Sequence, residues 1–173
     1  LYYVGEPSRR PDEVDPTRIA RHIVGRAVLS TNGTLIDRET ADALKTFGLS
    51  YVGISIDGPE AIHDRFRGKQ GAFRASLEAI QHCLDVGIRV GIRVTLTEYN
   101  FPHLDELFDL IEEENIPRAC FYHLAYAGRG DRIVKHDLMH EETRAAVDTI
   151  FARTQDFHRR GIAKDILTVD NHT

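Results

Sequence analysis

The sequence predicts an α/β protein whose parallel strands form a partial (β/α)6 TIM-like barrel, truncated at both ends. Two patterns lead to this prediction. Strand-like and helix-like segments alternate about every thirty residues, the length of one strand–crossover unit, and such crossovers require a parallel sheet. The strand-like segments are apolar on one face only, which distinguishes a barrel wall from a doubly wound sheet with both faces buried.

The stretch Tyr51–Gly58, read Y-V-G-I-S-I-D-G, shows the second pattern most clearly. Its apolar positions alternate with Gly53, Ser55 and Asp57, and the period of two indicates a strand with unlike faces. Residues 88–96 repeat the alternation, with Arg93 on the polar side. Closed barrels fill their interior with bulky branched residues, whereas these side chains do not, so we expect an open barrel that holds a polar ligand.

The other elements follow from apolar periodicity and from capping residues. Strands are expected at residues 1–4, 26–30, 51–58, 88–96, 119–124 and 166–169. Helices are expected from Asp15-Pro16 to Gly25, from Asp37 to Gly48, over 73–84, over 102–111 and over 141–159. The last helix is expected to bury Val147, Ile150, Phe151, Thr154 and Phe157, and His63–Lys69 is expected to be a charged loop.

Composition excludes several classes of protein. The 173 residues carry a net charge of -5 with no basic run, which gives no indication of nucleic-acid binding. No apolar segment approaches the roughly 20 residues of a membrane helix. The two cysteines, Cys83 and Cys120, are too far apart for a zinc motif or a disulfide framework, and they are expected in the core. These features predict a cytoplasmic protein with no nucleic-acid partner, no membrane partner and no metal ligands of its own.

The two ends indicate a fragment. The chain begins at Leu1, without Met and already inside an apolar run, and it stops soon after another such run. We therefore expect residues 1–173 to be the barrel core of a longer polypeptide.

Polar residues follow or end five of the predicted strands. The set comprises Glu6, Asn32, Ser55, Asp57, Arg93, Thr95, His123 and Tyr126. Because the carboxyl ends of parallel strands meet at one rim, these groups are expected to converge there. They suit a zwitterionic molecule with a sugar, in which Arg93 binds a carboxylate, Ser55 and Asp57 bind vicinal hydroxyls and Glu6 lies near an ammonium group.

Each of these residues also has a structural interpretation, and the sequence leaves both open. Asn32, in T-N-G, is typical of a turn, and Asp57 before Gly-Pro could cap the next helix. Arg93 could pair with a structural carboxylate, and His123 could be a hydrogen-bonded core histidine. Glu6 could be an ordinary loop residue.

An ordered series of motifs resembles the radical S-adenosylmethionine (SAM) enzymes. The motifs are Gly5-Glu6-Pro7, Leu29–Asp37, Ile54–Gly58, His63–Gly68 and Gly71-Ala72-Phe73. The resemblance is greatest to the branch with extra C-terminal iron–sulfur domains. Within it, Phe121–Gly130 and Ile166–His172 are similar to the haem-synthesis members, those of haem d1 biosynthesis most of all.

The resemblance implies a partial six-stranded barrel that binds S-adenosylmethionine beside a [4Fe–4S] cluster and produces a 5′-deoxyadenosyl radical. It also implies that Gly5 and Glu6 meet the methionine amino group, that Ser55 and Asp57 contact the ribose, and that Arg93 holds the carboxylate. Asn32 belongs to the same cofactor-binding set, whereas His123 and Tyr126 are candidate substrate contacts, and no catalytic residue is assigned. The implied substrate is a sirohaem-derived tetrapyrrole losing propionate side chains, with a flavodoxin or ferredoxin as electron donor.

The chain departs from the family pattern in its cysteines. The cluster motif C-x3-C-x2-C and the C-terminal cysteine-rich domain are both absent, and Val4-Gly5 replaces the usual double glycine. Because thiolates hold such a cluster, its ligands are expected outside this chain, and the fragment alone is expected to be inactive. Three other functions stay open: a peptide-modifying maturase of the same branch, a cluster-free barrel that binds a nucleoside or tetrapyrrole, and a hydrolytic metal barrel.

Overall fold

A computed structural model of the chain describes residues 2–4, 27–124 and 134–169. These residues form one six-stranded sheet in the order β1-β2-β3-β4-β5-β6, and every neighbouring pair is parallel. The strands are β1 (Tyr2–Val4), β2 (Val28–Thr31), β3 (Tyr51–Ser55), β4 (Arg89–Thr95), β5 (Arg118–Tyr122) and β6 (Asp165–Val169). The predicted α/β architecture with a parallel sheet is confirmed.

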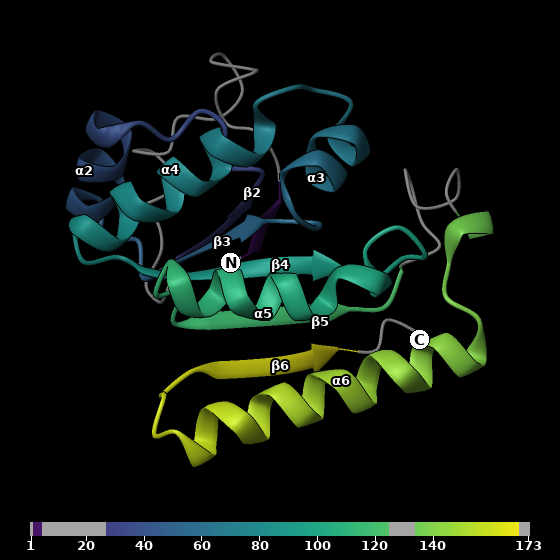
Figure 1. Cartoon of the computed structure of the whole chain (residues 1–173). Helices are drawn as coiled ribbons and strands as arrows, with labels where there is room; N and C mark the ends of the chain where they lie inside the picture. The colour runs from purple at the N-terminus through teal and green to yellow at the C-terminus, as the bar shows by residue number, and fades with distance from the viewer. Residues whose placement is uncertain (1, 5–26, 125–133, 170–173) are drawn as a thin grey trace.

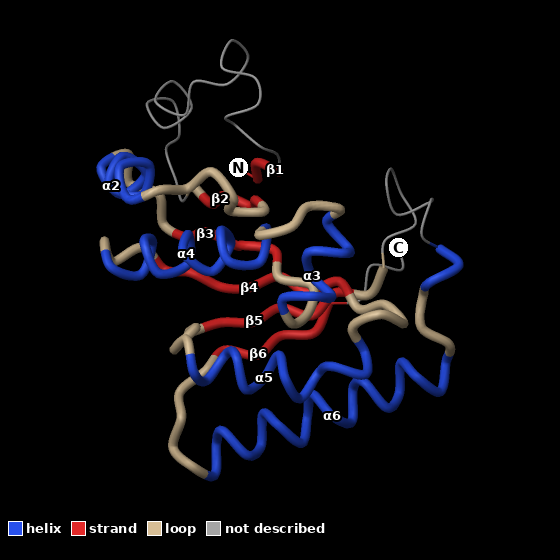
Figure 2. The backbone as a smooth tube through the Cα atoms, turned by 45° about the horizontal axis from the view of Figure 1, so that its top comes forward, coloured by secondary structure: helices blue, strands red, loops and turns tan. Residues whose placement is uncertain are grey.

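The helices connect these strands and lie together on one face of the sheet, as Figures 1 and 2 show. They are α2 (Arg38–Thr46), α3 (Glu60–Arg67), α4 (Ala72–Asp85), α5 (Leu104–Glu113) and α6 (His140–Arg159), with the short 3-10 helices η2 (Phe101–His103) and η4 (Val134–His136). The predicted helix from Asp15 to Gly25 lies outside the described residues. We call the helix-covered face of the sheet the outer face and the opposite one the inner face.

The core lies between the outer face and the helices. Alternate residues of β3, β4 and β5 point into it, and each is at most 1% exposed: Val52, Ile54, Val90, Ile92, Val94, Ala119 and Phe121. The ring of Phe108 on α5 stacks on that of Phe121, with centroids 5.5 Å apart. The apolar face that the sequence predicts for these strands is therefore confirmed.

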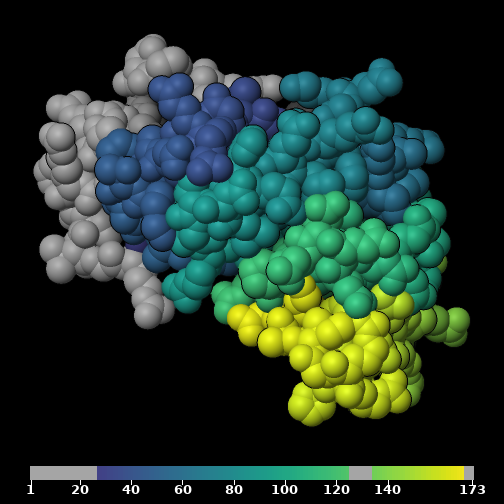
Figure 3. Space-filling model, turned by 60° about the vertical axis from the view of Figure 1, so that its left-hand side comes forward, coloured from purple at the N-terminus to yellow at the C-terminus, as the bar shows by residue number. Residues whose placement is uncertain are grey.

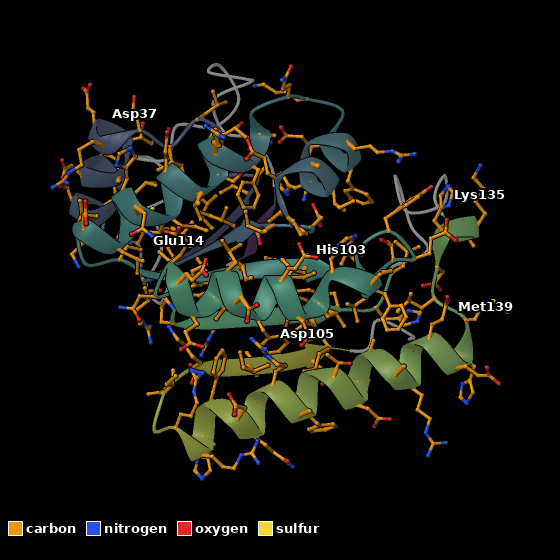
Figure 4. The ribbon with its side chains drawn as sticks, viewed as in Figure 1. Asp37, His103, Asp105, Glu114, Lys135 and Met139 are labelled. Atoms are coloured by element: carbon orange, nitrogen blue, oxygen red, sulfur yellow. The ribbon has the colours of Figure 1, made fainter. Side chains whose placement is uncertain are left out.

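Capping and charge fix the helices locally. Asp37 is the N-cap of α2, as predicted, and its carboxylate accepts a hydrogen bond from the Thr40 N–H at 2.8 Å. On α5, Asp105 lies on the side facing α6 (Figure 4), where it pairs with Arg153 at 3.7 Å. Asp109, one turn further along α5, also pairs with Arg153. This ion-pair group joins the exposed edges of the two helices.

The expected charged loop at His63–Lys69 is wrong, because most of it belongs to α3. One side of this helix is buried, with His63 fully inaccessible to solvent. Glu60 lies in its first turn and Arg65 and Arg67 in its last turn, so that these charges complement the helix dipole. The high charge of the stretch concealed an amphipathic helix.

One expected core position of α6 is also wrong. Phe151 is 60% exposed, whereas Ile150 and Phe157 are 2% exposed and Ala146 is fully buried. The helix contacts the rest of the protein along one narrow stripe, and residue 151 lies about 100° around the helix from residue 150.

The described segments follow one another across one side of the molecule, from blue at α2 to yellow at β6 (Figure 3). Among the residues that the structure describes, none of the helices is both long and apolar enough to cross a membrane.

Candidate functional site

The inner face carries the alternate residues of the same strands. From β3, β4 and β5 these are Tyr51, Gly53, Ser55, Arg89, Gly91, Arg93, Thr95, Arg118, Cys120 and Tyr122. Most of the larger side chains among them are half-buried, unlike those of the outer face. The described part of the chain therefore has a polar surface formed by small and charged residues on one side of the sheet.

Arg93 crosses this surface near the carboxyl ends of the strands. Its side chain lies over Gly53, where a Cβ atom would come within 2.9 Å of the Arg93 Cδ atom. The guanidinium donates a hydrogen bond to the Ser30 hydroxyl and lies 4.5 Å from the centroid of the Tyr122 ring. Glycine on β3 thus provides the space that lets a cation lie flat between β2 and β5.

Ser55 is directly beside Arg93 in the register of β3 and β4. Both residues are half-buried, so both remain accessible on the inner face. The main-chain N–H of Ile56 donates to the Arg93 carbonyl at 3.1 Å, which fixes the two strand ends against each other. A hydroxyl and a guanidinium are therefore held side by side at the rim where parallel barrels bind ligands.

A second layer of side chains closes the amino-terminal half of the inner face. Tyr51 lies across Gly91, where a Cβ atom would come within 2.4 Å of the Tyr51 hydroxyl. The Arg118 guanidinium lies 5.5 Å from the centroid of the Tyr51 ring and pairs with Asp165 at 2.9 Å. The sequence shows the glycines, but not which side chains cover them.

Asp57 follows β3 and is only 2% exposed. Its carboxylate pairs with Arg67 of α3, and the Nδ1 atom of His63 lies 3.8 Å from it. Burial raises the pKa of Asp57 above its usual value, and the Arg67 cation opposes that rise. Asp57 does not cap α3, because the N-cap is Pro59, without a side-chain cap hydrogen bond. The predicted ribose contact of Asp57 stays a prediction.

Asn32 lies in the turn after β2. Its side-chain oxygen accepts hydrogen bonds from the Thr34 N–H at 2.9 Å and from the Thr34 hydroxyl at 3.0 Å. Its carbonyl accepts a hydrogen bond from the Ser76 hydroxyl of α4 at 2.7 Å. These contacts are those of the turn residue considered from the sequence, and the cofactor contact predicted for Asn32 stays a prediction.

His123 lies directly after β5, and its N–H donates to the carbonyl of Val169 at 3.1 Å. The Nε2 atom of its ring lies 3.7 Å from a carboxylate oxygen of Asp137, and the two side chains are 16% and 12% exposed. This pair lies at the rim. The predicted contact between His123 and a substrate stays a prediction. Gly5, Glu6 and Tyr126 lie outside the described residues.

A polar group at the same rim was not predicted. The Tyr99 hydroxyl lies 2.8 Å from a ring nitrogen of His136, and the His136 ring lies 2.7 Å from a carboxylate oxygen of Glu98. Lys135 and Met139, which flank this histidine, appear in Figure 4 beyond the ends of the strands. The partners are 37 and 38 residues apart, and no local pattern connects them.

Within the described ranges, no group of three or more histidine, cysteine, aspartate or glutamate residues could hold a metal ion. Cys83 and Cys120 are both free and buried, as expected of core residues. Burial raises the pKa of the Cys83 thiol to about 11, which disfavours the thiolate form that binds iron. The described residues therefore do not fit an iron–sulfur cluster.

Comparison with known sequences gives the family. The Radical SAM superfamily matches residues 1–111. An Fe-coproporphyrin III synthase from Methanosarcina barkeri is 52% identical over 99% of this chain and 43% of its own length. A pre-heme d1 synthase from Dinoroseobacter shibae is 40% identical over 96% of this chain and 42% of its own length. The chain thus spans less than half the length of these relatives.

Solved structures show the same fold. Streptococcus suis SuiB bound to precursor peptide SuiA matches 99% of this chain and 38% of its own, with a TM-score of 0.79 at 17% identity. Native anSMEcpe with bound AdoMet and Kp18Cys peptide matches 95% of this chain and 49% of its own, with a TM-score of 0.73 at 20% identity. These likenesses confirm the predicted partial barrel.

The family and its neighbours also confirm the predicted cofactors, S-adenosylmethionine and a [4Fe–4S] cluster, as those of this enzyme family. By its sequence match and its fold, the chain belongs to the Radical SAM superfamily, and its relatives include heme synthases.

Proposed function

We propose that the protein is a radical SAM enzyme that modifies a sirohaem-derived tetrapyrrole. The observation that carries this proposal is the 52% identity, over 99% of the chain, to an Fe-coproporphyrin III synthase. The haem d1 branch suggested by the motifs is represented by a relative with 40% identity. The higher identity favours Fe-coproporphyrin III over pre-heme d1 as the product.

The carboxyl end of the inner face supports binding of S-adenosylmethionine. Arg93 presents a guanidinium suited to the methionine carboxylate, and Ser55 presents a hydroxyl suited to the ribose. Gly5 and Glu6, which follow β1 in the sequence, are proposed to meet the methionine amino group. In this proposal the cofactor lies across β3 and β4.

The β5–β6 side of the inner face supports binding of a macrocycle. Tyr122 is half-buried there, and Leu167 and Val169 of β6 are 43% and 36% exposed. In the register of the two strands, Cys120 pairs with Leu167 and Tyr122 pairs with Val169. A flat, apolar ring could pack on this surface while its carboxylates reach polar groups at the rim, and His123 is proposed as one of them.

The ligands of the cluster are proposed to come from sequence outside these 173 residues, together with a C-terminal cysteine-rich domain. Reductive cleavage of S-adenosylmethionine consumes one electron, so a flavodoxin or ferredoxin is proposed as the donor. We propose a cytoplasmic location, where both kinds of donor occur.

A peptide substrate is the second candidate. A PqqA peptide cyclase from Gluconobacter oxydans is 28% identical over 97% of this chain. The lower identity places this function behind the tetrapyrrole.

The test compares the two candidate substrates in separate reactions. The anaerobically purified holoenzyme is incubated with S-adenosylmethionine, a reductant and either a sirohaem derivative or a PqqA-type peptide. We expect 5′-deoxyadenosine to form together with a tetrapyrrole that has lost side chains, detected by mass spectrometry. Modification of the peptide with no change in the tetrapyrrole would overturn the proposal.

A further inference from the structure

The stretch from Asp57 to Gly68 contains charged residues that the proposed function does not use. Asp57 lies two residues beyond Ser55, and its 2% exposed carboxylate pairs with Arg67 in the last turn of α3. The main-chain N–H of Ile56, the residue before Asp57, donates to the Arg93 carbonyl at 3.1 Å. Asp57 therefore lies one residue beyond the hydrogen bond that joins the ends of β3 and β4 beside Ser55 and Arg93, and its side chain connects that point to α3.

His63 adds a second connection at the same place. The main-chain N–H of Asp57 donates to the Nδ1 atom of His63 at 3.0 Å. The His63 ring is fully buried and meets the Phe73 ring of α4 edge-on, with centroids 5.9 Å apart. The side chains of His63 and Arg67 thus attach α3 to the main chain and to the side chain of Asp57, just beyond β3.

The other side of α3 is attached to α4. Asp64 accepts hydrogen bonds from the N–H of Gly71 at 2.6 Å and from the N–H of Phe73 at 2.8 Å. These are unpaired donors at the start of α4, which a carboxylate satisfies well. Since α4 packs against β3 and β4, α3 is held between a fixed helix and the two strand ends.

We propose that Asp57 and Arg67 form a clasp that positions Ser55 and Arg93 for S-adenosylmethionine, and that Asp57 is a positioning residue, not a ribose contact. This inference rests on the proposed cofactor-binding role of Ser55 and Arg93. Arg67 supplies the counter-charge for a carboxylate that is out of contact with water, and a buried charge without its partner is strongly unfavourable. Loss of Arg67 therefore displaces the two strand ends together.

A direct ribose contact would require a different environment for Asp57. A carboxylate that binds vicinal hydroxyls needs both access and free acceptor sites. The Asp57 carboxylate is 2% exposed and already paired with Arg67, whereas Ser55 at the end of β3 remains accessible. A positioning role and a ribose contact therefore predict different affinities for S-adenosylmethionine when both Asp57 and Arg67 are replaced.

The test measures the affinity of the holoenzyme for S-adenosylmethionine by anaerobic calorimetry in Arg67→Gln, Asp57→Asn and the double variant. Arg67→Gln should weaken binding by about tenfold or more, because the ion pair is lost and a buried carboxylate remains without its counter-charge. The double variant should bind more tightly than Arg67→Gln alone, because no uncompensated charge is left. Arg67→Lys keeps the positive charge but loses the planar guanidinium, so its affinity for S-adenosylmethionine should fall between those of wild type and Arg67→Gln.

Arg74→Gln is the matched control. Arg74 pairs with Glu60 of α3 at 2.7 Å, but its side chain is 74% exposed, so the variant should bind the cofactor like wild type. The clasp is overturned if Arg67→Gln binds normally, or if Asp57→Asn alone abolishes binding and the double variant recovers none of it. A wild-type protein without affinity for S-adenosylmethionine overturns the clasp and the proposed function together. Normal binding without tetrapyrrole turnover overturns the proposed function alone.

Discussion

The two faces of the sheet are formed by the same strands, yet they differ in burial and in the type of residue they carry. On β4, Val90, Ile92 and Val94 point outward and are at most 1% exposed under the helices. Between them, Gly91 and Arg93 point inward, where the larger side chain is half-buried and lies over the glycine of the neighbouring strand. The difference shows that stability is concentrated on the outer face, which leaves the inner face available for binding.

The largest difference is expected on β5. Phe121→Ala should destabilise the protein by about 3–5 kcal/mol, because Phe121 is 1% exposed and stacks on Phe108. Tyr122→Ala, one position along on the inner face, removes a half-buried ring and should cost clearly less. Denaturant unfolding of both variants measures the two values, and equal losses would contradict the distinction between the faces.

A smaller effect is expected from filling the inner face. Gly91→Ala should destabilise by about 1–3 kcal/mol, because the new methyl group would overlap the Tyr51 hydroxyl and touch the Arg118 side chain. Tyr51→Phe removes that hydroxyl and should restore part of the loss in the double variant. If Gly91→Ala leaves the free energy of unfolding unchanged in denaturant unfolding, the Tyr51 side chain does not lie across Gly91.

The smallest effect concerns pH. Burial lowers the pKa of His63 to about 4, so the folded protein keeps this ring neutral, whereas the unfolded chain protonates it near 6.5. The contribution of neutral His63 to the free energy of unfolding is fully present above pH 6.5 and is lost as the pH falls towards 4. Between pH 7 and 5.5 the loss should be about 1 kcal/mol.

His63→Asn isolates this contribution, because the amide oxygen can still accept the hydrogen bond from the Asp57 N–H. Its unfolding free energy should depend less on pH than that of wild type. His158→Asn, at an exposed position in the last turn of α6, should keep the wild-type pH profile. Parallel profiles for wild type and His63→Asn would show that His63 does not resist protonation.

Much of the outer face could be predicted from the sequence, because period-two and helical apolar patterns report directly on burial. The alternation over residues 88–96 gave the correct face for Ile92 and for Arg93. The cap at Asp37 was equally readable, since capping depends on a few adjacent residues. The positions of the strand ends were predicted less exactly. The strand expected over 51–58 ends at Ser55, so Asp57 lies beyond it.

The clasp and the polar groups at the rim could not be predicted from the sequence. Their partners are distant in sequence, or they lie in a charged stretch that resembles a loop. The expected loop at His63–Lys69 concealed a helix in which Arg67 pairs with the buried Asp57. The contact between His123 and Asp137 joins two connections that only the folded sheet brings together. Composition and periodicity carry no information on such pairs.

The central claim is that the carboxyl end of the inner face binds S-adenosylmethionine through Arg93. The most direct measurement is the calorimetric affinity of the holoenzyme for this cofactor in Arg93→Gln, with Arg89→Gln as the control. Arg89 lies on the same face of the same strand but is exposed at its amino end. We predict that affinity falls about 10- to 100-fold in Arg93→Gln and stays at the wild-type value in Arg89→Gln. A folded Arg93→Gln protein with wild-type affinity would contradict the account.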